Sequence, residues 1–169
     1  MKKIILVTGG QRSGKSAFAE HKAHELSRNP VYMATAKVWD EEFRQRVEKH
    51  KRNRGPEWTN IEEEKHLSLH DMTGKTVVID CVTLWCTNFF MDCNSDVNLS
   101  LSELKDEFDR FTGRDAVYIF VTNEIGLGGV AGNALQRSFT DLQGYANQYI
   151  ASKADEVYFM ISGIPLKVK

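Results

Sequence analysis

The stretch that decides the fold is Gly9-Gly10-Gln11-Arg12-Ser13-Gly14-Lys15-Ser16, which satisfies the phosphate-loop pattern G-x-x-x-x-G-K-[ST]. A short apolar run from Lys3 to Val7 precedes it, and residues with helical spacing follow it from Ser16 to Leu26. Glycines let the backbone curl until successive N–H groups point at one anion, and the start of the helix adds its positive dipole end. A chance match in a chain of this length occurs on the order of one time in a hundred. The sequence therefore predicts a phosphate-binding loop.

Two side chains of this loop and one distant carboxylate fit a magnesium nucleoside triphosphate. Lys15 can reach the β- and γ-phosphates, and the Ser16 hydroxyl can coordinate Mg²⁺, which prefers oxygen ligands. Asp80 ends the apolar run Val77 to Ile79 and fits the second metal-side acid that P-loop proteins carry on a neighbouring strand. Taken alone, an aspartate that closes a strand is more often a cap or turn former, by about two to one. The phosphate loop favours the metal role.

The rest of the chain alternates between strand patterns and helix patterns. Further strands are predicted over Val31 to Ala36, Thr76 to Ile79, Ala116 to Val121 and Glu156 to Ile161, and helices over Leu101 to Phe111 and Asn133 to Ser152. This alternation predicts an α/β fold with a mostly parallel sheet. The tail from Ser162 to Val168 contains Pro165, which strand edges tolerate, so we expect it to turn back as an antiparallel edge strand. Because no repeat or linker divides the chain, we expect one domain over residues 1–169.

Composition excludes several classes of protein. The chain has 169 residues, of which 41% are hydrophobic and 27% are charged, which is typical of a folded globule and not of a disordered or fibrous chain. The formal net charge of −1 supplies no global attraction for nucleic acid or for an anionic membrane. The first apolar run is too short for a signal segment or a membrane span. Cys81, Cys86 and Cys93 lack the pairing of a zinc site, so we expect reduced core thiols in a cytoplasmic protein.

A second candidate feature is the polar segment from Asp40 to Arg54, which is predicted to be a helix with Asp40 as its N-cap. Helical spacing places Phe43, Val47, His50 and Arg54 on one stripe, surrounded by Arg44, Arg46, Lys49, Lys51 and Arg52. One interpretation is a solvated face without chemistry, favoured by about two to one on sequence alone. The other is a neutral His50 imidazole that attacks phosphorus while the cations stabilise the developing charge.

A second glycine-rich stretch, from Thr122 to Asn133, follows the predicted strand that ends at Val121. Its Gly126, Gly128 and Ala131 imitate a dinucleotide fingerprint, but the spacing from the strand is wrong and no strand-end acid follows, so NAD binding is rejected. The loop either closes over a second substrate or serves as a flexible connector, at about even odds.

These stretches resemble the bifunctional adenosylcobinamide kinase/adenosylcobinamide-phosphate guanylyltransferase family along nearly the whole chain. The resemblance also rests on Trp58, on Asp80 to Trp85 with Thr87-Asn88, on Val121 to Glu124, and on Ser162-Gly163 with Lys167. It implies a RecA-like P-loop fold, a homotrimer, and two reactions in cobalamin assembly. The enzyme would phosphorylate adenosylcobinamide with ATP or GTP, then transfer GMP from GTP to adenosylcobinamide phosphate through a guanylylated His50, releasing pyrophosphate.

The same resemblance implies the site residues. His50 and Lys15 would be catalytic, with Ser16 and Asp80 at Mg²⁺. The nucleotide would be bound by Gly9, Gly10, Gln11, Arg12, Ser13, Gly14, Lys15, Ser16, Ala34, Thr35, Lys51, Arg54, Glu62 and Leu84. A carboxylate such as that of Glu62 can read the guanine N1–H and N2–H donors. The chain departs from the family at Ala131, where proline is usual, and near Asn60 and Glu64, where threonine and proline are usual.

Two alternatives remain open on the sequence. A single-activity P-loop kinase would use the polar segment as a lid over another small hydroxyl substrate. A RecA-like binding module would use the same basic segment to grip nucleic acid, although the near-zero net charge opposes this.

Overall fold

The structure is a computed structural model that describes residues 1–37, 44–45, 48 and 54–169. The predicted helix from Asp40 to Arg54 falls mostly outside the described residues, as do His50 and Lys51. Within it, Arg44, Gln45 and Glu48 are helical and exposed.

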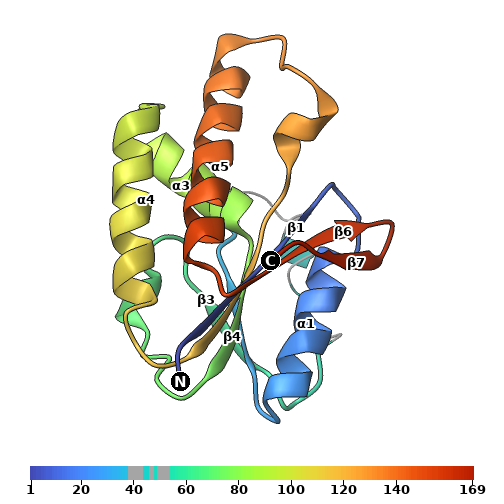
Figure 1. The fold of residues 1–169 in the computed structure, drawn as a ribbon. Coiled ribbons are helices and arrows are strands. Elements are labelled where there is room, and N and C mark those ends of the chain that lie inside the picture. Colours follow the sequence, from blue (N-terminus) through green and yellow to red (C-terminus); the bar gives the residue numbers. More distant parts are fainter. Residues whose placement is uncertain (38–43, 46–47, 49–53) are drawn as a thin grey trace.

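One seven-stranded sheet forms the centre of the molecule (Figure 1). Its strands are β1 (Lys3–Gly9), β2 (Val31–Ala34), β3 (Thr59–Glu62), β4 (Thr76–Asp80), β5 (Val117–Val121), β6 (Glu156–Ile161) and β7 (Ile164–Lys167). They lie in the order β3-β2-β4-β5-β1-β6-β7. All neighbours pair in parallel except β6 and β7, which pair antiparallel. The predicted parallel sheet with an antiparallel C-terminal edge strand is confirmed.

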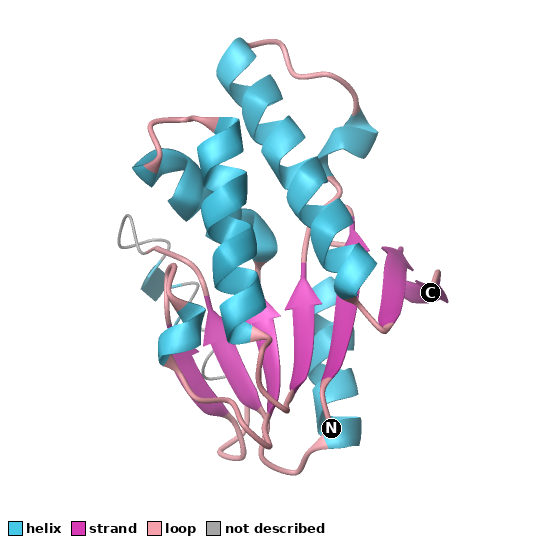
Figure 2. Ribbon diagram, turned by 60° about the vertical axis from the view of Figure 1, so that its left-hand side comes forward, coloured by secondary structure: helices cyan, strands magenta, loops and turns pink. Residues whose placement is uncertain are grey.

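Helices cover both faces of this sheet (Figure 2). They are α1 (Lys15–Leu26), α3 (Val82–Asp92), α4 (Val97–Phe111) and α5 (Ala134–Lys153), with 3-10 turns η1 (Leu67–Leu69) and η2 (Ile125–Gly128). Helix α1 packs on β1, β4 and β5 from one side, whereas α3, α4 and α5 pack on one another on the other side. The Asp96 side chain caps α4 by accepting a hydrogen bond from the Leu99 N–H at 2.9 Å, which starts this helix four residues before its predicted start at Leu101.

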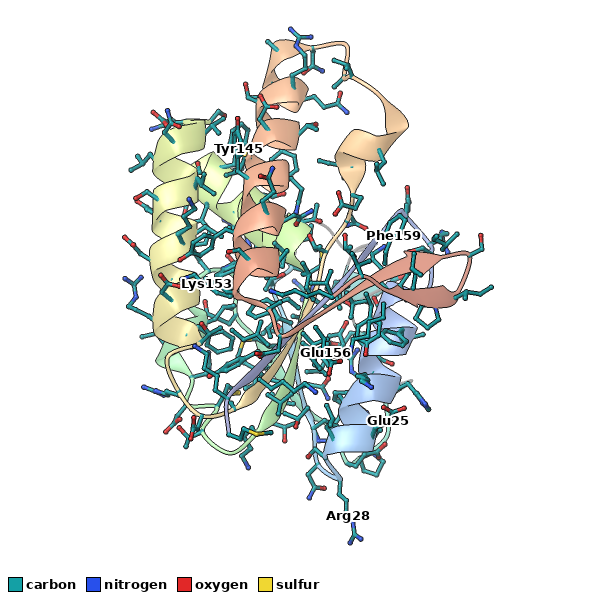
Figure 3. All side chains as sticks on the ribbon, viewed as in Figure 1. Glu25, Arg28, Tyr145, Lys153, Glu156 and Phe159 are labelled. Atoms are coloured by element: carbon teal, nitrogen blue, oxygen red, sulfur yellow. The ribbon has the colours of Figure 1, made fainter. Side chains whose placement is uncertain are left out.

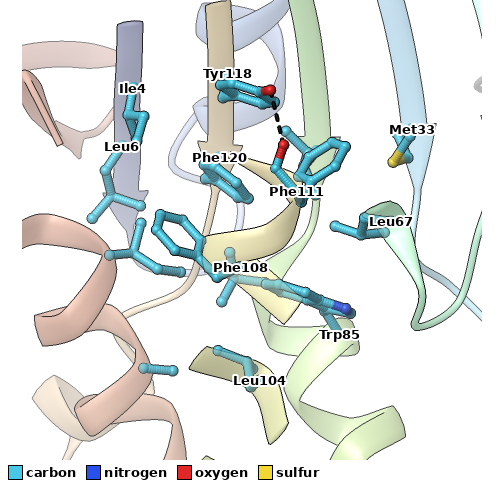
Figure 4. Close-up of a cluster of buried hydrophobic side chains, with 14 of the residues drawn as sticks. Ile4, Leu6, Met33, Leu67, Trp85, Leu104, Phe108, Phe111, Tyr118 and Phe120 are labelled. Atoms are coloured by element: carbon cyan, nitrogen blue, oxygen red, sulfur yellow. Dashed lines mark hydrogen bonds between the residues drawn. The ribbon is translucent and has the colours of Figure 1, made fainter. Parts of the chain in front are cut away.

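Two hydrophobic clusters fill the spaces between the sheet and its helices. Alternation along β1 sends Ile4 and Leu6 into the larger cluster and Ile5 and Val7 into the smaller one beside α1. The larger cluster gathers aromatic rings, including Trp85, Phe108, Phe111, Tyr118 and Phe120 (Figure 4). Burying a large apolar side chain stabilises the fold by about 1.5–3 kcal/mol. The sheet is therefore a rigid platform for the loops at its carboxyl edge.

Candidate functional site

The loop between β1 and α1 is shaped by glycines. Gly14, the N-cap of α1, has a φ of 91° and offers no side-chain acceptor to the first N–H groups of the helix. A Cβ on Gly14 would lie 3.2 Å from the Gly163 Cα, and a Cβ on Gly9 only 2.7 Å from the Met160 carbonyl oxygen. The Gly163 N–H also donates to the Ser13 carbonyl oxygen at 2.9 Å. The β6–β7 turn thus packs directly against the phosphate loop. The first N–H groups of α1 have no side-chain acceptor and can bind an anion.

Lys15 lies folded over this loop. Its side chain is buried, and Nζ donates to the Gly10 carbonyl oxygen and contacts the Ser13 hydroxyl at 3.4 Å. Burial lowers the pKa of the Lys15 ammonium, and the charge of Asp80 opposes that shift. The ammonium is therefore held inside the curve of backbone where the motif predicts a phosphate.

Ser16, Asp80 and Tyr32 meet at a single carboxylate oxygen. The Ser16 hydroxyl donates to Asp80 Oδ2 at 2.7 Å, and the Tyr32 hydroxyl donates to the same oxygen at 2.7 Å. Burial first, and then the Asp80 charge, raise the pKa of Tyr32, so its hydroxyl stays protonated and remains a donor. A hydroxyl and a carboxylate side by side are the oxygen ligands that Mg²⁺ takes beside substrate phosphates. The residues present fit that ion.

Arg54 packs on the Tyr32 ring in this cluster. Its guanidinium carbon lies 3.5 Å from the centroid of the Tyr32 ring, its Nε donates to Asn60 Oδ1 at 2.9 Å, and Nη1 lies 3.6 Å from Glu20 Oε1. Trp58 contacts Tyr32 in an edge-to-face arrangement, with 6.0 Å between the ring centroids. The end of the predicted polar helix is therefore anchored beside the metal side of the phosphate loop.

The other predicted contacts lie along the same edge of the sheet. Ala34 at the end of β2 pairs with Glu62 at the end of β3 and with Asp80 at the end of β4. The hydroxyl of the next residue, Thr35, is fully buried, donating to the Cys81 carbonyl oxygen at 2.8 Å and accepting from the Cys81 N–H at 2.9 Å. Gly10, Gln11, Arg12 and Glu62 are exposed and Leu84 is half-buried in α3.

The sequence assigned no role to two polar residues that this edge brings to the phosphate loop. Tyr32 bonds Asp80 across 48 positions, and Glu124 bonds Thr8 across 116. Both carried a usable signal. Tyr32 stands two residues before Ala34 on the same face of a strand, and Glu124 follows a buried strand much as Asp80 ends one.

The three cysteines are free thiols, as expected. Cys86 and Cys93 are buried and Cys81 is half-buried. Burial raises the pKa of the Cys81 thiol to about 12 and also raises that of Cys86. Within the described ranges, no group of three or more His, Cys, Asp or Glu side chains is placed to hold a metal ion. None of the helices described is long and apolar enough to cross a membrane.

One cavity of about 420 Å³ opens between the η2 loop and the start of α5. It is lined by Gly126, Gly129, Val130, Ala131, Ala134, Arg137, Ser138, Thr140 and Asp141. The second glycine-rich stretch of the sequence therefore forms one wall of a hollow that begins two residues after Glu124.

Known proteins resemble this chain in sequence and in fold. Residues 5–168 match the family model described as cobinamide kinase / cobinamide phosphate guanyltransferase. The chain is 34% identical over 184 residues to the bifunctional adenosylcobalamin biosynthesis protein CobU of Escherichia coli strain K12, covering 98% of this chain and 99% of that protein. It is also 34% identical over 170 residues to the bifunctional adenosylcobalamin biosynthesis protein CobP of Pseudomonas aeruginosa, covering 97% and 96%.

Among solved structures, the flagellar accessory protein FlaH of Methanocaldococcus jannaschii superposes with a TM-score of 0.51 at 13% identity, covering 99% of this chain and 78% of that one. At this identity the likeness concerns the fold alone. Together with the strand order, it identifies the expected RecA-like P-loop architecture.

Proposed function

Because the chain belongs to the cobinamide kinase / cobinamide phosphate guanyltransferase family, we propose that it catalyses two successive steps of cobalamin assembly. It phosphorylates the aminopropanol hydroxyl of adenosylcobinamide with ATP or GTP, and then transfers GMP from GTP to adenosylcobinamide phosphate. The full-length family match carries this proposal, and the two curated relatives are both named as bifunctional. The single-activity kinase is not favoured, since the family description contains both activities.

The phosphate loop serves the first step by holding the triphosphate. The N–H groups from Gly9 to Ser16 surround the β- and γ-phosphates, and the Lys15 ammonium leaves the Gly10 carbonyl to neutralise them. Ser16 and Asp80, whose oxygens lie 2.7 Å apart, would hold Mg²⁺. That ion supplies charge neutralisation on the phosphate oxygens. The transferred phosphoryl group is thereby oriented for attack by the acceptor hydroxyl.

The second step uses a covalent carrier, and His50 is the group we propose for it. Its imidazole nitrogen attacks the α-phosphorus of GTP, an N–P bond forms, and the bond to pyrophosphate breaks. A phosphate oxygen of adenosylcobinamide phosphate then attacks the same phosphorus, and the N–P bond breaks. The anchoring of Arg54, four residues after His50, beside Asp80 supports delivery of this segment to the nucleotide.

The remaining predicted residues complete the proposed nucleotide site. Ala34, Thr35, Glu62 and Leu84 belong to the carboxyl edge of the sheet or to α3, and Lys51 adjoins His50. The Thr35 hydroxyl is bonded to Cys81 on both sides, its N–H donates to the Asp80 carbonyl oxygen at 3.2 Å, and its carbonyl oxygen accepts from the Asn88 amide at 2.8 Å. A nucleotide contact at this position therefore falls to the Thr35 methyl group or to the second lone pair of its carbonyl oxygen.

We also propose that the protein works as a homotrimer. Exposed apolar side chains on the η2 loop and on α5 support an assembly: Leu127 is 71%, Val130 88%, Leu135 59% and Tyr145 51% exposed. Figure 3 shows Tyr145 about half-way along α5, on the side towards α4. Light scattering coupled to gel filtration should give three times the mass of one chain, and a single-chain mass would exclude the trimer.

The two activities are tested separately with labelled nucleotides. With γ-labelled ATP or GTP and adenosylcobinamide, label should enter the corrinoid. With α-labelled GTP alone, label should stay on the protein in an acid-labile form, as a phosphoramidate requires. Lys15→Ala should abolish both signals, while His50→Ala should abolish only the second. Transfer to the corrinoid with no labelled protein at any time would remove the histidine from the mechanism.

A further inference from the structure

We propose that Glu124 is the general base of the phosphoryl-transfer step, accepting the proton of the acceptor hydroxyl. This assignment rests on the proposed kinase activity and extends it to a residue that the phosphate-loop motif does not contain.

Strand β5 lies between the two strands that carry the phosphate site. The order β4-β5-β1 puts it between Asp80, at the end of β4, and the phosphate loop, which follows β1. All three strands are parallel, so their carboxyl ends share one edge of the sheet. The residues after Val121 therefore emerge between the metal side and the loop, where a terminal phosphate has to lie.

Contacts with β1 fix Glu124 at this edge. Its N–H donates to the Gly9 carbonyl oxygen at 3.1 Å, and its Oε1 accepts from the Thr8 hydroxyl at 2.8 Å. Thr8 and Gly9 are the last residues of β1, so the carboxylate is bonded directly to the root of the phosphate loop. Glu124 itself is half-buried, which leaves part of its carboxylate accessible to a substrate.

A buried polar network holds the backbone that leads to Glu124. Thr122 donates to Asn147 Oδ1 at 2.7 Å, and the Gln143 amide donates to both, at 2.9 Å each. The Asn147 amide also donates to the Asn123 carbonyl oxygen at 3.1 Å. Helix α5 thereby fixes the two residues before Glu124. The position of Glu124 is therefore set before substrate binds.

The other carboxylate at this position is already engaged. Asp80 accepts hydrogen bonds from Ser16 and Tyr32 on one oxygen, which commits it to the metal side. Glu124 has no ion pair with a lysine, arginine or histidine of the described chain, so no neighbouring cation there competes for its lone pairs. Glu124 accepts one hydrogen bond, from Thr8, where Asp80 accepts two from the residues on the metal side.

The η2 loop that follows Glu124 leads towards the cavity of about 420 Å³, whose lining starts at Gly126 and does not include Glu124 itself. In the proposed step the acceptor hydroxyl lies between the Glu124 carboxylate and the γ-phosphate. Its O–H bond breaks with the proton passing to Glu124, its oxygen forms the new P–O bond, and the bond to the β-phosphate oxygen breaks, releasing the nucleoside diphosphate.

The bifunctional chemistry supplies a sharp test, because guanylylation of the protein needs no acceptor proton to be removed. Glu124→Gln should lower kcat for adenosylcobinamide phosphorylation by about 10²–10⁴-fold, the usual contribution of general base catalysis. The same variant should form the GMP adduct from GTP and pass it to adenosylcobinamide phosphate at the wild-type rate. Glu124→Asp, which keeps a carboxylate, should recover part of the kinase rate.

Glu156→Gln is the matched control, because Glu156 is also half-buried and accepts a tyrosine hydroxyl at 2.7 Å, but it stands at the amino end of β6. Its kinase rate should equal that of the wild type. A Glu124→Gln variant with normal phosphorylation, or one in which both half-reactions fall together, would overturn the base assignment. If instead the wild-type protein phosphorylates nothing, the proposed function fails and not this residue alone.

Discussion

Replacing Tyr32 by phenylalanine isolates one hydrogen bond at the metal side of the phosphate loop. The ring stays, and with it the Arg54 stack at 3.5 Å and the Trp58 contact at 6.0 Å, while the 2.7 Å bond to Asp80 is lost. A hydrogen bond to a charged group contributes about 1.5–3 kcal/mol. Because Ser16 still donates to the same oxygen, we expect the lower end, about 1.5 kcal/mol, or a fall in Tm of about 3–6 °C for a chain of this size.

The assay is urea unfolding of wild type and variant, followed by the kinase rate as a function of Mg²⁺ concentration. Since Asp80 loses the group that fixes its orientation, the variant should need more Mg²⁺ for half-maximal rate. Tyr149→Phe is the control, because the Tyr149 hydroxyl donates to Asp109 at 2.7 Å on the exposed surface between α4 and α5. It should change stability by less than about 0.5 kcal/mol. Equal effects of the two substitutions on stability and Mg²⁺ requirement would refute the positioning of Asp80 by Tyr32.

Gly14→Ala should lower the free energy of unfolding in urea by about 1–3 kcal/mol, because the Gly14 φ is 91° and the new Cβ would lie 3.2 Å from the Gly163 Cα. Gly144→Ala, in the middle of α5 with no atom outside the helix backbone within 4 Å of the new Cβ, is the control and should not lower it. The Lys3 hydrogen bond lowers the pKa of the Glu156 carboxyl to about 2, below its value of about 4.3 in the unfolded chain. The stability that ionised Glu156 contributes is therefore complete above about pH 4.3 and is lost as the pH falls towards 2. Glu156→Gln should make the free energy of unfolding less dependent on pH in this range, and an unchanged acid unfolding curve would contradict the pKa shift. The Cys86 thiol, fully buried and with a raised pKa, should react with a disulfide reagent only after unfolding, and rapid labelling of the native protein would disprove its burial.

The strands buried on both faces of the sheet could be predicted, because such strands consist almost entirely of consecutive apolar residues. The strand predicted from Glu156 to Ile161 is β6 residue for residue, and the predicted C-terminal edge strand is β7. Two elements escaped prediction for opposite reasons. Helix α3 (Val82–Asp92) is buried around most of its circumference and so lacks an amphipathic stripe, while β3 (Thr59–Glu62) is a short, polar, exposed edge strand.

Some parts of the candidate site are set by neighbouring residues in the sequence, and others by contacts between distant segments. The phosphate loop consists of consecutive residues, so the motif predicts both its position and the positive φ of Gly14. The Asp80–Ser16 contact, which joins β4 to α1, was expected from the P-loop pattern. The roles of Tyr32 and Glu124 depend on contacts that only the folded sheet creates, since strand order cannot be read from a single sequence.

The central claim is that one phosphate loop serves a kinase and also loads GMP onto a histidine of the same chain. Mass spectrometry of the intact protein after incubation with Mg²⁺ and GTP, followed by peptide mapping, tests it most directly. The account predicts one GMP per chain, located on His50 and absent from His50→Ala and Lys15→Ala. A protein that turns over GTP with the corrinoid phosphate yet never carries GMP, or carries it on another residue, would contradict the account.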